Sequence, residues 1–285
     1  MNKRREKAIV AALLRFEKSL HNCKTDFLLK CGSEEHKLIT DIEKHPHAFV
    51  IGCVLDRVIK AEKAWAAPYK LKQRIEQIGV FSFSHLGKLT PDDWEKYLGR
   101  QDDDPEFLHI NWRNVKQGMP LCLHSAMQVI NRYSKGDGDA RHMWTGDNLR
   151  GKDIVARFKE IRGVGDKIAN MAVRILVTRF KQPIETASID ISVDRHIARV
   201  VRRLGLIGKN TPKSQEKKVI VDKARELYPK FPAFIDLPIF IIGRNFCHET
   251  NPNCGGCPMS TLCDYALHKR KPAPKTKTKR KRMKK

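Results

Sequence analysis

The 285 residues are 41% hydrophobic, which suffices for one large or two modest domains with hydrophobic cores of their own. The net charge is +24. Residues 267–285 contain eleven Lys and Arg and no acid, so they carry +11 of this charge. The remainder of the chain carries the other +13 and is therefore basic as well. No secretory signal is visible, and the longest apolar runs, residues 49–55 and 237–242, are too short to cross a bilayer, which excludes secreted and membrane proteins.

The pattern of apolar residues indicates helices along most of the chain. From Lys3 to Leu20 apolar residues recur close to a 3.6-residue period, as on one face of a helix. Thr90 is followed by proline and two aspartates, the pattern of a helix start with proline at its first position. We find no convincing strand alternation and no repeat of solenoid length, so the sequence predicts an all-α protein. Further helices are expected at residues 49–65, 69–78, 121–133, 154–161 and 167–180.

A Gly-Val-Gly turn, formed by Gly163, Val164 and Gly165, separates the last two of these helices. Glycines on both sides of one apolar residue permit a sharp turn whose backbone N–H groups point outward together. The next helix adds its positive N-terminal end, so the turn could hold a phosphate without reading base sequence. A turn that only joins two helices is the plain interpretation, and the basic charge of the chain favours DNA phosphate.

Lys167 lies at the start of the helix that follows this turn. The positive end of the helix dipole, partial burial and nearby arginines all disfavour the ammonium form, so we expect the lysine pKa to fall. A lysine that is neutral part of the time can attack a sugar carbon and form a Schiff base. A solvated surface lysine is the alternative.

Four of the eight cysteines gather near the C-terminus, as Cys247, Cys254, Cys257 and Cys263, separated by six, two and five residues. In a reducing compartment such a cluster indicates metal ligands rather than disulfides. Prolines and glycines between them predict a tight loop that turns four thiolates inward. Structural zinc prefers two Cys-x-x-Cys pairs further apart, whereas short spacings suit an iron–sulfur cubane. Spacing alone therefore favours iron–sulfur and leaves zinc and free thiols open.

Three segments carry a specific resemblance to a known family: the cysteine loop, the hairpin and the aspartate segment of residues 193–200. The loop from Phe246 to Cys263 resembles the iron–sulfur loop of endonuclease III-like and adenine-glycosylase-like enzymes, and residues 161–170 resemble the endonuclease III-like hairpin with its catalytic lysine. The chain is thus similar to the helix-hairpin-helix DNA glycosylases over roughly residues 45–267. The resemblance implies a [4Fe–4S] cluster on the four cysteines, with a structural role beside the DNA backbone. Nearby basic candidates for that contact are Lys217, Lys218, Arg244 and residues 269–271.

The resemblance also implies catalytic roles. Lys167 implies a bifunctional glycosylase with lyase activity, because relatives that only excise the base carry another residue there. Base excision builds positive charge on the deoxyribose, so the site needs a carboxylate to stabilise it and to help activate the nucleophile. Residues 193–200 look like the family's catalytic aspartate motif, which gives Asp194 this role. Asp190 is the alternative, with a helix cap or a salt bridge as its plain interpretation.

The DNA-recognition side departs from the family. Residues 47–65 look like the family's early helix pair, which normally carries a glutamine that inserts into DNA, but Asp56 and Arg57 occupy that neighbourhood. Arg57 could fill the gap left by a flipped base and bond the orphaned partner; an exposed helical arginine is the alternative. Arg195 either contacts a phosphate or is solvated. The connection around residues 181–191 also looks longer than in endonuclease III.

By family analogy the chain should form two helical domains with a DNA-binding cleft between them. A six-helix barrel with the helix-hairpin-helix motif is expected over residues 46–186, and a cluster domain should combine residues 1–45 with 187–268. Residues 269–285 are expected to be a disordered basic tail.

The implied function is base-excision DNA repair by a DNA glycosylase and AP lyase, acting as a monomer on double-stranded DNA with a damaged or mismatched base. Oxidised pyrimidines are the favoured lesion. A mismatch or uracil glycosylase of the monofunctional type and a non-catalytic binder of damaged DNA remain the alternatives, although phosphate binding alone requires neither Lys167 nor Asp194. We expect no membrane partner and an intracellular location, in the cytoplasm and nucleoid of a prokaryote or the nucleus of a eukaryote.

Overall fold

The computed structural model describes residues 3–20, 25–26, 29–57, 59–77, 79–99 and 118–270. Within these residues the protein is helical, as predicted, apart from a two-residue antiparallel ribbon of β1 (Thr25–Asp26) and β2 (Leu29–Lys30). None of the helices in this part of the chain combines the length and the apolar composition that crossing a membrane requires. The helices are α1 (Lys3–Leu20), α2 (Glu34–Thr40), α3 (Pro46–Leu55), α4 (Ala61–Glu76), α5 (Phe83–Leu86), α6 (Pro91–Leu98), α7 (Met119–Tyr133), α8 (Gly151–Lys159), α9 (Asp166–Thr178), α10 (Arg195–Arg203), α11 (Lys213–Leu227), α12 (Asp236–Asn245) and α13 (Asp264–Arg270), with 3₁₀ turns η1 (Ala140–Met143) and η2 (Pro232–Ile235).

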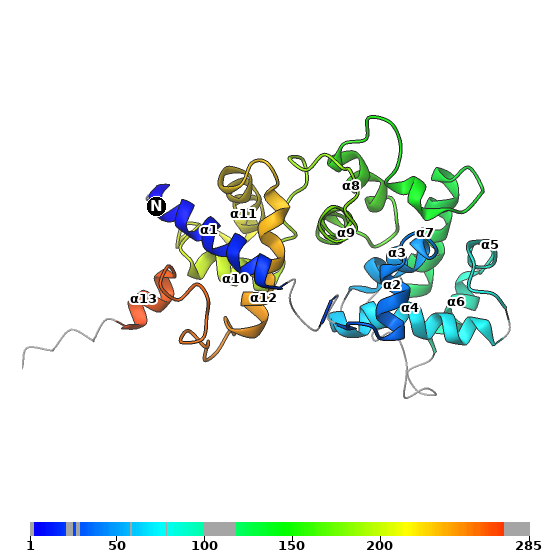
Figure 1. Ribbon diagram of the computed structural model, residues 1–285, viewed down its shortest axis with the longest axis horizontal. Helices are drawn as coiled ribbons and strands as arrows, with labels where there is room; N and C mark the ends of the chain where they lie inside the picture. The colour runs from blue at the N-terminus through cyan, green and yellow to red at the C-terminus, as the bar shows by residue number, and fades with distance from the viewer. Residues whose placement is uncertain are drawn as a thin grey trace, which may run out of the picture.

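The helices form two lobes that lie side by side (Figure 1). The first lobe contains α2 to α9, and its core is built around large buried side chains such as Phe49, Trp94 and Phe158. The second lobe combines α1 with α10 to α13, so the N-terminal helix packs among the C-terminal helices through Ile9 and Leu13. Each lobe therefore buries an apolar core of its own, which is the main driving force for folding of each part.

The boundary expected at residue 45 does not follow these two cores. Leu38 and Ile39 of α2 belong to the core of the first lobe, where α2 packs against α3 and α4. Of the residues described before position 45, only α1 contributes to the core of the second lobe. Helix α2 belongs to the first lobe because its apolar side chains are buried in the core of that lobe. At the other end, α13 continues to Arg270, so the first two residues of the expected disordered tail are helical, and residues 271–285 lie outside the described residues.

The expected helix at residues 49–65 is two helices. Helix α3 ends at Leu55, because Asp56 leaves the helical backbone with ψ of 53°, and α4 begins at Ala61. The break that we expected before residue 69 is absent, since Pro68 lies inside α4. Proline lacks the N–H of a helix bond and disfavours this position, yet Pro68 is buried on the packed face of α4, where burial of apolar surface offsets that cost.

Candidate functional site

The Gly-Val-Gly turn joins α8 to α9 as a tight hairpin. Gly163 has φ of +81°, a left-handed conformation that favours glycine, and a Cβ there would lie 1.9 Å from Nη1 of Arg57. Val164 is buried and anchors the turn in the first core. Gly165 is exposed and precedes α9 without a capping side chain, so the first backbone N–H groups of α9 have no side-chain acceptor. This is the local geometry that an anion requires.

Arg57 lies against this hairpin. Its Nη1 is 3.3 Å from Sγ of Cys122 on α7, and its guanidinium packs on Gly163. Arg57 is half-buried in the bend after α3, so the alternative of an exposed helical arginine is wrong. The side chain packs against the Gly-Val-Gly turn, a position that the sequence did not predict.

Lys167 shares one electrostatic neighbourhood with two acids. It is half-buried in the first turn of α9, while Asp56 ends α3 and Asp194 precedes α10. Burial raises the pKa of the Asp56 carboxyl; the positive charge of Lys167 opposes this shift, and the negative charge of Asp194 adds to it. The fold therefore places Lys167 and Asp194, from separate segments, within electrostatic range of one and the same carboxyl group, that of Asp56. It also adds Asp56, which sequence reasoning noted only as a neighbour of Arg57.

Asp194 has a defined orientation because it caps α10. Its Oδ1 accepts the backbone N–H of Ile197 at 2.8 Å, the usual bond of an aspartate N-cap. The competing acid, Asp190, forms a two-fold ion pair with Arg225, with both N–O distances at 2.8 Å. The salt-bridge interpretation of Asp190 is therefore what the structure shows. Arg195 is exposed at the start of α10.

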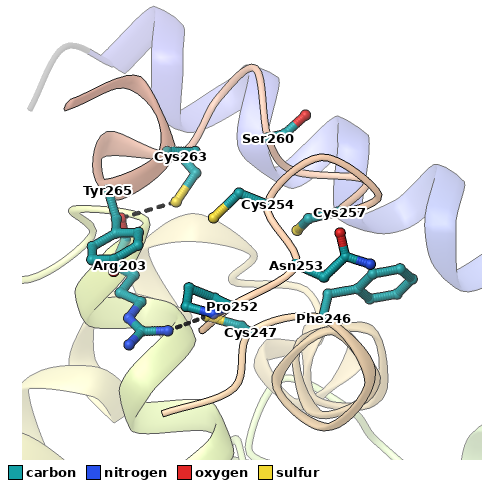
Figure 2. A pocket seen from close by; sticks show the side chains of 11 residues that line it. Arg203, Phe246, Cys247, Pro252, Asn253, Cys254, Cys257, Ser260, Cys263 and Tyr265 are labelled. Carbon is teal, nitrogen blue, oxygen red and sulfur yellow. Dashed lines mark hydrogen bonds between the residues drawn. The ribbon is translucent and has the colours of Figure 1, made fainter. Parts of the chain in front are cut away.

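The four clustered cysteines line one pocket in the loop between α12 and α13 (Figure 2). The pocket has a volume of about 270 Å³, counting the solvent space at its mouth. Burial raises the pKa of the Cys257 thiol, and the charges of the other three thiolates raise it further. A raised pKa favours the protonated thiol, so thiolates at these positions would be favoured only by a positive charge placed in the pocket.

The arrangement of the four cysteine sulfurs is relevant to the kind of metal group that the loop could hold. Among the described residues, no three His, Cys, Asp or Glu side chains lie close enough together to hold a single metal ion. Mononuclear zinc requires every sulfur at about 2.3 Å from one point, whereas a cubane places each thiolate on a different iron. The four sulfurs line one pocket within a single loop, which is the donor set that a group held by four thiolates would require.

Arginines of the second lobe hold this loop in place. Arg199 donates from Nε to the carbonyl of Cys247 at 2.5 Å, and Arg203 donates from Nη1 to Sγ of Cys247 at 3.3 Å and to the carbonyl of His248 at 2.6 Å. Arg5 of α1 reaches the carbonyl of Leu262 at 2.7 Å. The half-buried Arg199 also donates from Nη2 to the carbonyl of Gly243 at 2.8 Å. The four-residue spacing of Arg199 and Arg203 places them on one face of α10 and is the sequence signal for this role.

Two of the basic candidates for DNA contact, Lys217 and Arg244, instead join the lobes. Lys217 of α11 lies 2.7 Å from Oδ2 of Asp166 at the start of α9, and Arg244 of α12 forms an ion pair with Glu62 of α4. Each pair connects a helix of the second lobe to a helix of the first. These side chains therefore have acidic partners within the protein.

No protein-family model matches the chain. Among curated proteins it is similar to Endonuclease III of Rickettsia prowazekii, with 31% identity over 120 residues that cover 40% of this chain and 50% of that protein. Endonuclease III of Thermotoga maritima is 27% identical over 128 residues, covering 45% of this chain and 54% of that protein. The matched stretch thus spans about half the length of these curated relatives.

Solved structures match over nearly the whole chain. A trapped endonuclease III–DNA covalent intermediate superposes with a TM-score of 0.55 at 15% identity, covering 93% of this chain and 99% of that chain. A thermostable thymine-DNA glycosylase superposes with a TM-score of 0.60 at 18% identity, covering 93% and 98%. At these identities the likeness concerns the fold. The chain therefore has the two-lobed helical fold of the endonuclease III-like DNA glycosylases, and its curated sequence relatives carry the name Endonuclease III.

Proposed function

We propose that this protein is a base-excision DNA glycosylase with AP lyase activity on double-stranded DNA. The observation that carries the proposal is the placement of Lys167 in the first turn after the Gly-Val-Gly hairpin, within electrostatic range of the Asp56 carboxylate, on which Asp194 also acts. A phosphate-binding turn requires none of these three side chains. Schiff-base chemistry requires a nucleophilic amine and a carboxylate close to it.

The hairpin would grip the DNA backbone. The first N–H groups of α9 and the backbone around the exposed Gly165 form a site for a phosphate. Exposed Arg195 lies at the start of α10, next to Asp194, and adds positive charge on the side of the sugar. Arg57 supports the hairpin through Cys122 and Gly163, and it would have to leave these contacts to fill the gap of a flipped base.

The reaction would proceed through attack by the lysine amine, stabilisation of the sugar's positive charge by a carboxylate, and loss of the amine proton. With the damaged nucleotide rotated out of the duplex, Lys167 Nζ forms a bond to the sugar C1′ while the C1′–base bond breaks and its electrons leave with the base. The carboxylate of Asp194 stabilises the positive charge that develops on the sugar. The amine then loses its proton, for which Asp194 and Asp56 are the nearby acceptors, and a Schiff base to the opened sugar results. Elimination of the 3′ phosphate from this adduct breaks the strand.

The residues that would hold a [4Fe–4S] cluster are Cys247, Cys254, Cys257 and Cys263. When bound, the cluster supplies cationic iron that neutralises the four thiolates and ties the loop together, with no part in base excision. The chain contributes the orientation of the loop. Arg203 Nη1 donates to Sγ of Cys247, a bond that stabilises the thiolate.

Borohydride trapping on a panel of duplexes tests the proposal. The panel carries an oxidised pyrimidine, uracil or thymine opposite guanine, oxidised guanine, and a bare abasic site. We expect a covalent adduct on the oxidised pyrimidine and on the abasic duplex, and none with Lys167→Ala. An adduct on the mismatched duplexes instead would assign the protein to mismatch repair. Absence of an adduct on every duplex would refute the lyase and leave base-only excision or DNA binding.

A further inference from the structure

One side of α9 faces the segment that leads to Asp194. Lys167, Asn170 and Arg174 follow one another at spacings of three and four residues, which places them on the same side of the helix. Asn170 is buried, and its Oδ1 accepts the backbone N–H of Asp190 at 2.8 Å. The helix that carries the nucleophile therefore also binds the start of the segment that carries the carboxylate.

Further along this side, Arg174 meets a carboxylate from the other lobe. Nε of Arg174 lies 3.9 Å from Oδ2 of Asp236, the first residue of α12, and the two side chains are only 9% and 7% exposed. Two charges buried this deeply are costly unless they pair. This ion pair lies at the junction of the lobes, because α9 belongs to the first lobe and α12 to the second.

Asp236 also holds the backbone next to Asp194. The same Oδ2 accepts the N–H of Ser192 at 2.8 Å, two residues before Asp194. On its other side Asp194 is fixed by the cap bond to Ile197. The position of the Asp194 carboxylate is thus set by Asp236 from one direction and by α10 from the other, while Arg174 links Asp236 to the helix of Lys167.

We propose that Arg174 and Asp236 are positioning residues that hold Asp194 at the working distance from Lys167. The chemistry in this inference rests on the proposed function, whereas the geometry does not. Displacing a reacting group by about 1 Å costs on the order of 100-fold in rate, so a loosened Ser192–Asp194 segment should react slowly even though the DNA-binding hairpin is intact.

Asp236→Ala in the full chain tests the inference, because it removes the acceptor for the Ser192 N–H and the partner of Arg174. We expect single-turnover trapping on an abasic duplex to fall on the order of 100-fold, with the Kd for the same duplex within about twofold of wild type. Asp236→Asn retains an oxygen for Ser192 and should recover much of the rate. Arg174→Met provides a second variant, with the charge removed and the side-chain length kept, for the case that Asp236→Ala does not fold.

Arg225→Met is the matched control. It breaks the ion pair to Asp190 on the exposed side of the same segment, where such pairs contribute little, and trapping should stay at the wild-type rate. Equal loss of trapping and DNA binding in folded Asp236→Ala and Arg174→Met would overturn the inference, because a general structural defect would explain both. Wild-type trapping in the two variants would overturn it as well.

Hydrogen exchange separates this inference from the proposed function. The Ser192 N–H should exchange faster in Asp236→Ala than in wild type, while amides of α10 beyond Ile197 stay protected. This readout requires no activity. If the wild-type protein forms no adduct, the proposed function fails and the exchange result alone decides whether Asp236 fixes the segment; unchanged protection of Ser192 would refute the positioning role.

Discussion

Asp166 and Lys217 form an ion pair across the junction of the two lobes, with Oδ2 of Asp166 2.7 Å from Nζ of Lys217. Lys159 pairs with the other carboxylate oxygen at 2.6 Å. Hydrogen bonds from Lys159 and Lys217 lower the pKa of Asp166 to about 2. A negative charge next to the hairpin would repel a DNA phosphate, and the two lysines neutralise it.

Asp166→Asn should tighten binding to undamaged duplex DNA, because it frees Lys159 and Lys217 beside the phosphate site. If each lysine gains one phosphate contact, the salt dependence of log K should steepen by about 1 to 2 units. Fluorescence anisotropy over a salt series measures both effects. Glu226→Gln is the control, since Glu226 pairs with Lys223 on α11 and its loss should leave the slope unchanged. An unchanged slope in Asp166→Asn would show that these lysines do not reach DNA.

Lys167→Ala should abolish strand nicking while DNA binding is largely retained. The substitution removes the amine that forms the Schiff base but leaves the hairpin backbone and the start of α9 intact. Nicking assays and anisotropy on an abasic duplex measure the two properties separately. Arg225→Met serves again as a control with both properties at wild-type level. Nicking by Lys167→Ala at the wild-type rate would remove this lysine from the mechanism.

Glycine at position 163 should be required for the hairpin. Gly163→Ala places a side chain on a left-handed residue, and the new Cβ meets Arg57 at 1.9 Å and Cys122 Sγ at 2.9 Å. Strain and the displaced arginine should together lower the free energy of unfolding by about 1–3 kcal/mol and weaken DNA binding. Gly165→Ala is the control, because no atom lies within 4 Å of its Cβ position and its φ is −100°. Urea unfolding and anisotropy compare the two, and equal behaviour would contradict the steric argument.

The cysteine loop should release iron when one ligand is lost. Purified wild-type protein should contain iron and acid-labile sulfide in equal amounts, and Cys254→Ser should lose both and melt at a lower temperature, because the repelling thiolates then lack their centre. Cys31→Ser is the control, since Cys31 is exposed outside the loop. Wild-type protein that holds one zinc and no sulfide would contradict the cluster.

Features carried by a short stretch of chain could be predicted from the sequence. The start of α6 follows from Thr90 and Asp93, whose side chains form a reciprocal capping box. The hairpin and the cysteine loop are likewise each contained in one short segment. Closely spaced glycines there indicate a turn, and closely spaced cysteines indicate metal ligands. The resemblance to the endonuclease III-like fold rested on these segments and is confirmed by the structure.

Contacts between distant segments could not be predicted in this way. Arg174 and Asp236 are unremarkable on their own helices, and only the packing of α9 against the start of α12 makes them a buried pair. Asp56 follows a helix in which every residue is buried, and its role depends on the segments opposite it. In each case the missing information was which surfaces meet, and apolar periodicity describes one helix at a time.

His47 is a buried histidine, and if its ring were protonated at Nε2, that N–H would have no hydrogen-bond acceptor among the described residues. Its exposed fraction is 5%, its Nε2 has no hydrogen-bond partner, and its ring lies 4.9 Å from that of Phe81. Burial, together with the charge of His45, lowers the pKa of His47 to about 4. In the unfolded chain a histidine titrates near 6.5, so between these values the unfolded state binds the proton and the folded state does not.

Folding stability should therefore fall as the pH drops from about 6.5 to about 4, and His47 alone accounts for about 3 kcal/mol of that loss. The contribution is fully present above the unfolded pKa and disappears as the pH falls through the folded pKa. His47→Phe keeps an aromatic ring beside Phe81 and removes the titrating group, so its stability should decline less over this range. Urea unfolding of both proteins at a series of pH values measures the difference. Parallel pH profiles for the two would show that His47 is already protonated in the folded protein or hydrated enough to accept the proton without cost.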